Sequence, residues 1–297
     1  MSSAPQPRGR MSLITNILFP VDFSPSSIAM ASYVKRAAIL FAAKVSLIHV
    51  FDPASYNGFE LFLRQTKDIA QDHHEIARRR LDSFLENEFP LSEYPRIVVA
   101  GDTATQIAQV AKRGFDLIIM PTHAGTFRRM LLGSTTAKVL NDADCPVLTT
   151  RHAETVTPHP LEHREWLCAI DLSPDSERVL RFANQAAAEA RAKLYIIHAI
   201  QGGDPDLPAQ PDLEAQIHPV EREETRERIA ALQKKLGSSA PVNIVVGSVK
   251  AALIDAARRY DADGLIIGRG PQSGARGRLR DLTYAIVRDS PFPVLSV

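Results

Sequence analysis

Short apolar runs alternate with amphipathic stretches along the first half of the chain. The apolar runs predict strands buried on both faces, near Ile17–Asp22, Val45–Phe51, Arg96–Ala100, Phe115–Pro121 and Pro146–Thr150. The amphipathic stretches between them predict helices near Ser26–Ala42, Asp68–Glu88, Thr103–Arg113 and Thr135–Ala143. Strands and helices that alternate in this way form right-handed crossovers, which gives a parallel sheet with helices on both faces.

The second half of the chain repeats the first. "NILFPVDFSPSS" reappears as "WLCAIDLSPDSE", so that Asp22 and Asp171 lie 149 residues apart. "FDLIIMP" and "DCPVLTT" recur as "ADGLIIG" and "PFPVLSV" at an offset of 147. The chain therefore predicts two tandem doubly wound α/β domains, each a five-stranded parallel sheet flanked by helices. A polar tail covers residues 1–12, the first domain 13–150, a Pro-containing linker 151–165, and the second domain 166–297.

The carboxyl ends of parallel strands are where α/β sheets place their ligands. In the first domain the residues at these ends are Asp22, His49–Phe51, Gly101–Asp102 and Pro121–His123. "DFSP" and its counterpart "DLSP" each predict a helix start just after the first of these ends. We expect Ser24 and Ser173 as N-caps, with a proline at the first helical position.

Composition narrows the class of protein. Apolar residues make up 45% of the 297, charged residues 23%, and the formal net charge is +1, so no overall field favours nucleic acid or an acidic membrane. Two cysteines cannot build a disulfide framework, which favours a reducing compartment. The apolar run from Leu13 to Val21 is too short for a signal or a membrane span. We therefore expect a soluble, cytoplasmic protein with neither a membrane nor a nucleic-acid partner.

One short segment has the chemistry of an anion site. In "LLGSTTAKV", Gly133 and Ser134 stand where a loop enters a helix, and Thr135 and Thr136 follow. Backbone N–H groups and hydroxyls at a helix start hold phosphates. An ordinary N-cap uses the same geometry, so the sequence leaves both interpretations open. Asp22 has the same ambiguity, between a nucleotide contact and a carboxylate that caps the following turn.

Taken together, the motifs resemble the universal stress protein family. "ILFPVDFSPSS", "LIHV", "AGDTATQI", "DLIIMPTHA" and "LLGSTTAKVLNDADCPVL" occur in the family's order and spacing. The resemblance implies a five-stranded parallel domain that pairs with another through its last strand, and some members bind ATP through a pattern written G-x2-G-x9-G-S/T. It implies contacts to adenine, ribose or phosphates from Pro20, Val21, Asp22, Val45, Met120, Pro121, Thr122, Gly133, Ser134, Thr135 and Thr136.

The first copy departs from that pattern. Pro121 and Ala124 stand at the first two glycine positions, with eight residues rather than nine before Gly133, and Gly125 can replace Ala124 only by changing the spacing again. Pro121 has no N–H to donate, and Ala124 at positive φ would cost about 1 kcal/mol. The first copy is therefore a degraded ATP site, and ATP is expected in domain 1 only.

The second copy departs further. Arg280 and Asp281 stand where Gly133 and Ser134 would recur, and a carboxylate there would repel a phosphate. The arginines between Arg269 and Arg288 could form an anion or nucleic-acid patch. A solvated loop with local Arg–Asp pairs is the favoured interpretation. We expect no ATP in the second copy.

Two functions follow from these motifs. The leading hypothesis is a non-enzymatic stress-response protein that binds an adenine nucleotide, ATP, in domain 1, with domain 2 as a paired scaffold. The alternative is a member that has lost nucleotide binding and acts as a protein-interaction or regulatory module. A nucleotide hydrolase is a weaker hypothesis, because no catalytic or metal-binding motif is present in the sequence. The two copies are expected to pair as a pseudo-dimer through "PVLTT" and "PVLSV", and a homodimer of the whole chain is left open.

Overall fold

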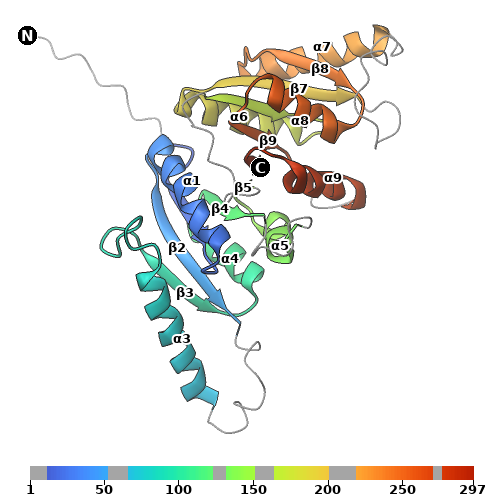
Figure 1. Cartoon of the computed structure of the whole chain (residues 1–297). Helices are drawn as coiled ribbons and strands as arrows, with labels where there is room; N and C mark the ends of the chain where they lie inside the picture. The colour runs from blue at the N-terminus through green and yellow to red at the C-terminus, as the bar shows by residue number, and fades with distance from the viewer. Residues whose placement is uncertain (1–11, 53–65, 123–131, 151–163, 201–218, 270–275) are drawn as a thin grey trace, which may run out of the picture.

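The computed structural model describes residues 12–52, 66–122, 132–150, 164–200, 219–269 and 276–297 (Figure 1). The strands of the first half are β1 (Asn16–Pro20), β2 (Lys44–Phe51), β3 (Arg96–Ala100), β4 (Leu117–Pro121) and β5 (Val147–Thr150), and its helices are α1 (Pro25–Phe41), α3 (Thr66–Ser83), α4 (Thr103–Ala111) and α5 (Ser134–Asp142). The strands of the second half are β6 (Glu165–Ala169), β7 (Lys193–Ile200), β8 (Val242–Val246), β9 (Gly264–Ile267) and β10 (Val294–Ser296), and its helices are α6 (Ser176–Ala190), α7 (Pro219–Leu236), α8 (Val249–Arg259) and α9 (Arg276–Asp289).

All of these strands form one ten-stranded sheet in the order β3-β2-β1-β4-β5-β10-β9-β6-β7-β8. Within each half the neighbouring strands are parallel, as predicted. β5 and β10 pair antiparallel, with Leu148 opposite Leu295. These two leucines are equivalent in the repeat, so a pseudo-two-fold axis passes between them. The predicted pairing through the last strands is therefore confirmed, and it merges the two five-stranded halves into a single continuous sheet.

Alternate residues of the strands face two separate cores. Ile17 and Phe19 of β1 are fully buried in one core, which also contains residues of α1 and α6. Leu18 lies between them and is buried in the opposite core with residues of α4, α5 and α8. This burial of both faces explains why the strands appear in the sequence as continuous apolar runs. Each core contains residues of both halves, so the halves share their hydrophobic interior.

Some element boundaries differ from the prediction. α3 ends at Ser83 rather than Glu88, because Leu85 adopts a left-handed backbone (φ 53°) that cannot continue a helix. β4 begins at Leu117 rather than Phe115, because the Phe115 N–H bonds to the Ala111 carbonyl and so belongs to the turn after α4. β6 begins at Glu165, one residue inside the predicted linker. The rest of that linker, 151–163, and tail residues 1–11 lie outside the described residues.

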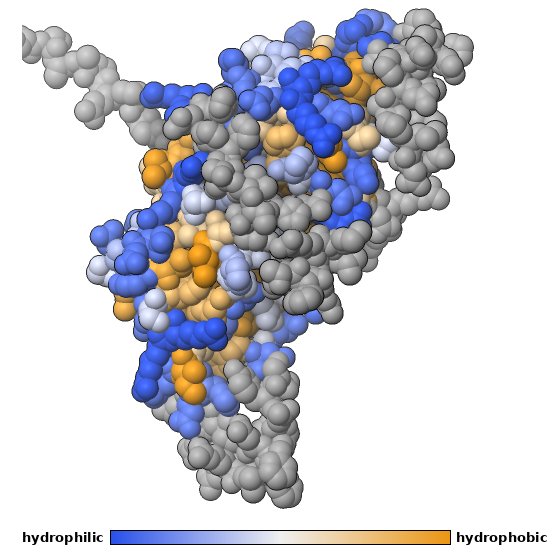
Figure 2. Space-filling model, viewed as in Figure 1, coloured by the Kyte–Doolittle hydropathy of each residue, from blue (hydrophilic) through white to orange (hydrophobic). Residues whose placement is uncertain are grey.

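On the face that Figure 2 shows, hydrophilic side chains gather toward the outer edges of both halves, and hydrophobic patches lie on each half inward of those edges. Large exposed hydrophobic residues include Ile28 and Ile39 on α1 and Ile76 on α3. Single exposed residues of this kind are ordinary on a protein surface. Among the described helices, none has both the length and the apolar character needed to cross a membrane.

A charged cluster joins α8 to α9 and gives the fold a testable pH dependence. The Arg288 Nε lies 2.8 Å from Asp289 Oδ1, and the Lys250 Nζ of α8 lies 3.1 Å from Asp289 Oδ2. The hydrogen bond from Arg288, helped by Lys250 and opposed by burial, lowers the pKa of Asp289 from 3.8 to about 2. The folded state therefore keeps the carboxylate charged at a pH where the unfolded chain already protonates it.

We expect the stability contributed by Asp289 to be present above pH 4 and lost as the pH falls from about 4 to about 2. D289N should show a smaller loss of unfolding free energy across that window than the wild type, measured by urea unfolding. The matched control is D255N, because Asp255 pairs with Arg258 only at 3.7 Å on the surface of α8. An unchanged acid dependence in D289N would contradict the assignment.

Candidate functional site

A cleft of about 530 Å³ lies at the carboxyl ends of β1, β2 and β4, between α4 and the start of α5. Its lining residues are Pro20, Val21, Asp22, Ser27, Ile48, Val50, Thr103, Ile107, Met120, Pro121, Leu132, Gly133, Ser134, Thr135 and Thr136. Most of the residues predicted from the sequence are therefore brought together in one place. Thr122 lies behind the cleft, where it is buried and its N–H donates to the Thr150 carbonyl at 3.2 Å. Gly125 lies outside the described residues, as does Ala124.

Val45 is not brought to the cleft. It pairs with Ile17 at the amino end of β2 and is buried in the core on the α1 side of the sheet. The cleft opens at the other end of that strand and on the other face, where Ile48 and Val50 line it. Val45 therefore does not line the cleft, in contrast to the expectation, and Ile48 and Val50 are the residues that line it from β2.

Several lining residues were not predicted: Ser27, Ile48, Val50, Thr103, Ile107 and Leu132. Four of them, in two pairs, carried a signal in the sequence that could have identified them. Val50 lies at the carboxyl end of its strand, two residues after Ile48, so both share one face. Thr103 and Ile107 are four residues apart on α4, which also places them on one helix face.

Asp22 organises the turn that leaves β1. Its Oδ1 accepts hydrogen bonds from the Ser24 N–H at 3.0 Å and from the Ser27 hydroxyl at 2.6 Å. Asp171 makes the same contacts in the second half, at 2.9 Å to the Ser173 N–H and 2.8 Å to the Ser176 hydroxyl. Burial would raise the pKa of Asp171, but these hydrogen bonds outweigh it and lower the pKa. The capping role considered for Asp22 is therefore present, and this turn uses only one of its two oxygens.

The two helices that follow these turns begin differently. Ser24 caps α1 as predicted, with its hydroxyl accepting the Ser27 N–H at 3.2 Å. The equivalent prediction for Ser173 is wrong, since α6 begins at Ser176 with Asp175 at the cap position. The Ser176 N–H bonds to the Ser173 carbonyl, so the residues between them form a separate turn before the helix.

α5 begins at the edge of the cleft without a side-chain cap. Gly133 is its N-cap in an extended conformation (φ −61°, ψ 140°), and no side chain caps the first turn. The Gly133 N–H donates to the Thr122 carbonyl at 2.8 Å, and the Thr136 hydroxyl donates to the Pro121 carbonyl at 3.0 Å. These two bonds fix the helix start against the end of β4. The N–H groups of the first turn have no partner within a helix, so they present positive charge to the cleft.

The two equivalent histidines near the strand ends each bond to a backbone carbonyl of their own half. The His49 Nδ1 lies 2.9 Å from the Val21 carbonyl, and the His198 Nδ1 lies 2.9 Å from the Ile170 carbonyl. Burial lowers the pKa of His49, which keeps this imidazole neutral near pH 7. Cys168 behaves as a buried apolar residue, and burial raises its pKa to about 12. No cluster of three or more metal-ligating side chains occurs in the described ranges.

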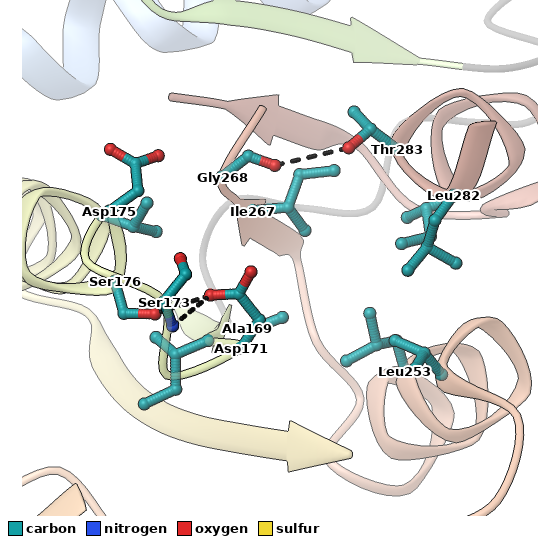
Figure 3. Close-up of a pocket in the computed structure, with 14 residues that line it drawn as sticks. Ala169, Asp171, Ser173, Asp175, Ser176, Leu253, Ile267, Gly268, Leu282 and Thr283 are labelled. Atoms are coloured by element: carbon teal, nitrogen blue, oxygen red, sulfur yellow. Dashed lines mark hydrogen bonds between the residues drawn. The ribbon is translucent and has the colours of Figure 1, made fainter. Parts of the chain in front are cut away.

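The equivalent pocket of the second half is much smaller, about 90 Å³ (Figure 3). Val249 begins α8 there, as Thr103 begins α4, and Leu282 stands 147 residues after Thr135. Figure 3 shows Leu253 and Leu282 facing one another across the space. Apolar side chains thus replace hydroxyls and occupy the volume that the first half leaves open.

The helix start is also missing from the second pocket. α9 begins at Arg276, so Arg280 and Asp281 lie within the helix rather than at its first residue. The Thr283 hydroxyl still donates to the Gly268 carbonyl at 3.4 Å, as Thr136 does to Pro121 (Figure 3). The second half has therefore kept the link between helix and strand and lost the uncapped N–H groups at the site.

Both halves match one protein family. The model described as "Universal stress protein family" matches residues 14–151 and again 163–297. The chain belongs to the universal stress protein family. It is 23% identical to "Universal stress protein Rv2623" of Mycobacterium tuberculosis over 274 residues, with 89% of each chain covered. It is 30% identical to "Universal stress protein MJ0531" of Methanocaldococcus jannaschii, over 48% of this chain and 86% of that protein.

Solved universal stress proteins show the same architecture. A universal stress protein of Archaeoglobus fulgidus covers 97% of both chains with a TM-score of 0.66 and 20% identity. This similarity confirms the tandem α/β fold. A universal stress protein solved in complex with cAMP matches 45% of this chain at 27% identity, with a TM-score of 0.33.

Proposed function

We propose that this protein is a cytoplasmic, non-enzymatic stress-response protein that binds an adenine nucleotide in domain 1 (β1–β5), with ATP as the favoured ligand. The cleft volume of about 530 Å³ lies within the range of small-molecule sites. The lining combines an apolar wall with a few polar groups, the composition typical of cofactor pockets. Domain 2 (β6–β10) serves as its paired scaffold.

The apolar wall suits a nucleobase. Val21, Ile48, Val50, Ile107 and Met120 line the cleft from β1, β2, α4 and β4. A flat base held among aliphatic side chains loses water-exposed apolar area on both faces. Asp22 lies beside this wall, and its turn leaves Oδ2 without a recorded hydrogen bond among the described residues. We assign that oxygen to a ribose hydroxyl.

The uncapped start of α5 is the observation that carries the proposal. The N–H groups of Ser134, Thr135 and Thr136 and the hydroxyls of Ser134 and Thr135 are available donors at the positive end of a helix. A helix start that opens onto a cleft of this size, with no side chain capping it, is suited to phosphate oxygens. The hydrogen bonds to Thr122 and Pro121 hold the start in place without using these donors.

A member that has lost nucleotide binding is the second candidate, favoured by Pro121. The first position of the family's glycine pattern lacks an N–H here, and its carbonyl is engaged by Thr136. Such a protein would act through its surfaces, as an interaction or regulatory module. The two candidates differ in whether the cleft is occupied in the purified protein.

Mass spectrometry of small molecules released from freshly purified protein tests the proposal, together with calorimetric titration by ATP. We expect one adenine nucleotide per chain, because the second pocket has only about 90 Å³. Two per chain would contradict the assignment of domain 2 as a scaffold. No nucleotide, with no heat of binding at millimolar ATP, would contradict the proposal and favour the second candidate.

A further inference from the structure

The carboxyl end of α5 is held by the other half of the protein. Arg269 follows β9, and its guanidinium donates to three carbonyls of the first half: Leu140 at 3.2 Å, Ala143 at 2.6 Å and Cys145 at 2.9 Å. Tyr284 of α9 adds a fourth contact, with its hydroxyl 3.1 Å from the Ala137 carbonyl. Figure 1 shows α9 beside α5, as these contacts require.

α5 has more need of such support than a longer helix would. It has only nine residues, and helices of this length are marginal without tertiary contacts. The carbonyls of its last turn have no partners within the helix. The Arg269 guanidinium satisfies two carbonyls at this end, those of Leu140 and the C-cap residue Ala143, and it also has the sign of charge that the helix dipole favours. Arg269 is therefore a carboxyl-terminal cap supplied from domain 2.

In the part of the chain that the structure describes, this support runs from domain 2 to domain 1. The residue equivalent to Arg269 is Thr122, whose hydroxyl lies 3.5 Å from the Thr150 carbonyl of its own half. The residue equivalent to Tyr284 is Ala137, which has no polar side chain. Both helices close their own carboxyl ends in the same way, with the Ser290 N–H donating to the Ile286 carbonyl at 2.8 Å in α9 and the Ala143 N–H donating to the Val139 carbonyl at 2.9 Å in α5. Among the described residues, α5 alone also receives a guanidinium from the other half.

Arg269 is itself anchored in the sheet. Its backbone N–H donates to the Val297 carbonyl at 3.1 Å, directly after β10. Arg178 of α6 donates to the same carbonyl at 3.1 Å while its guanidinium also pairs with Asp175. Since β10 pairs with β5, the segment that carries the guanidinium is tied to the junction between the halves.

We infer that Arg269, assisted by Tyr284, is a positioning residue for the nucleotide site, through which domain 2 holds α5 so that its first-turn N–H groups face the cleft. The inference rests on the proposed function for its effect on ATP. Its structural part, the capping of α5 by Arg269 across the junction, does not depend on a ligand. The capping and the effect on ATP binding are therefore measured by separate experiments.

Hydrogen exchange of the α5 amides in the full-length apo protein tests the capping of α5. R269M keeps an unbranched apolar stem and removes the donors, and we expect α5 protection to fall about tenfold or more while β1 and β6 keep theirs. The control is R178M, since Arg178 contacts the same Val297 carbonyl and, within the described ranges, its hydrogen bonds go to Asp175 and Val297 rather than to α5. Unchanged protection of α5 in R269M, or an equal loss in R178M, would overturn the inference.

ATP titration of the same variants measures the effect on the site. We expect R269M to bind about tenfold more weakly than the wild type, within the usual range of coupling between sites, with R178M unchanged. R269K, which keeps the charge but not the planar guanidinium, should have an affinity for ATP between those of R269M and the wild type. Y284F removes a single hydroxyl and should show a smaller loss in the same direction, so the inference stays testable if R269M folds poorly.

The two proposals fail in distinguishable ways. A wild-type protein that does not bind ATP but loses α5 protection in R269M contradicts the proposed function and leaves the capping intact. If the wild type binds ATP and R269M binds it equally tightly, the positioning role is contradicted and the proposed function is left intact.

Discussion

Replacing Gly133 with aspartate is expected to abolish nucleotide binding while α5 remains as stable as before. Asp is among the best N-cap residues, and Gly is only a few tenths of a kcal/mol poorer, so the change stabilises the helix by about that amount. The φ of −61° at this position suits any residue. The Gly133 N–H still donates to the Thr122 carbonyl, because that bond uses the backbone.

The same carboxylate removes the anion site. An aspartate at the N-cap accepts hydrogen bonds from the N–H groups of Thr135 or Thr136, which the proposal assigns to phosphate oxygens. Its negative charge also repels the phosphates. Each charge-assisted hydrogen bond lost is worth about 1.5–3 kcal/mol, so losing two of them weakens binding by about a hundredfold or more.

Calorimetric titration with ATP and thermal unfolding of the apo protein together test this variant. G133A is the control for the loss of glycine, because it adds a methyl group without a charge. G133S is the control for capping without charge, and it should weaken binding less than G133D. ATP binding by G133D at the wild-type affinity would show that the phosphates do not lie at α5.

The second large effect is expected on the free energy of unfolding, when buried leucines of the core are truncated. Leu18 of β1 and Leu167 of β6 are equivalent residues, and both are fully buried in the core on the α4 and α8 side. Truncation of a buried leucine to alanine costs about 2–5 kcal/mol, since it removes apolar contacts and leaves a cavity. We expect L18A and L167A each to lose stability in this range. I39A is the control, because Ile39 is 81% exposed on α1 and its loss should cost less than about 0.5 kcal/mol.

Urea unfolding of these variants also tests whether the halves act as one unit. Because the sheet is continuous and each core contains residues of both halves, we expect one transition that L18A and L167A both shift. Two transitions, of which each variant shifts only its own, would contradict a shared interior.

The repeat and the strands could be predicted because burial on both faces makes a strand a continuous apolar run. The pairing of the halves followed from the resemblance together with the recurrence of "PVLTT" as "PVLSV" at the end of the second copy. Val45 was misplaced because the resemblance was followed in preference to the direction of β2. The carboxyl end of that strand, near Val50, was the physical indication of where a ligand would lie.

The role of Arg269 could not be predicted. Its partners lie more than a hundred residues earlier in the chain, and no periodicity links a loop arginine to distant carbonyls. The predicted local Arg–Asp pairing is confirmed for Arg288, which pairs with Asp289, but Arg288 lies in helix α9 rather than in a loop. The prediction is wrong for Arg269, because the chain leaves β9 beside the end of α5.

Covalent fusion at the antiparallel junction between β5 and β10 frees the two halves from symmetry. In a dimer of identical subunits every substitution occurs twice, so an arginine that caps the neighbour's helix would also stand at the position of Thr122, next to Pro121 at the rim of the domain 1 cleft. A duplicated chain can place that arginine in one copy and keep threonine in the other. A fused chain can therefore reduce the pocket of one half, here to about 90 Å³, while that half holds the helix at the edge of the other cleft.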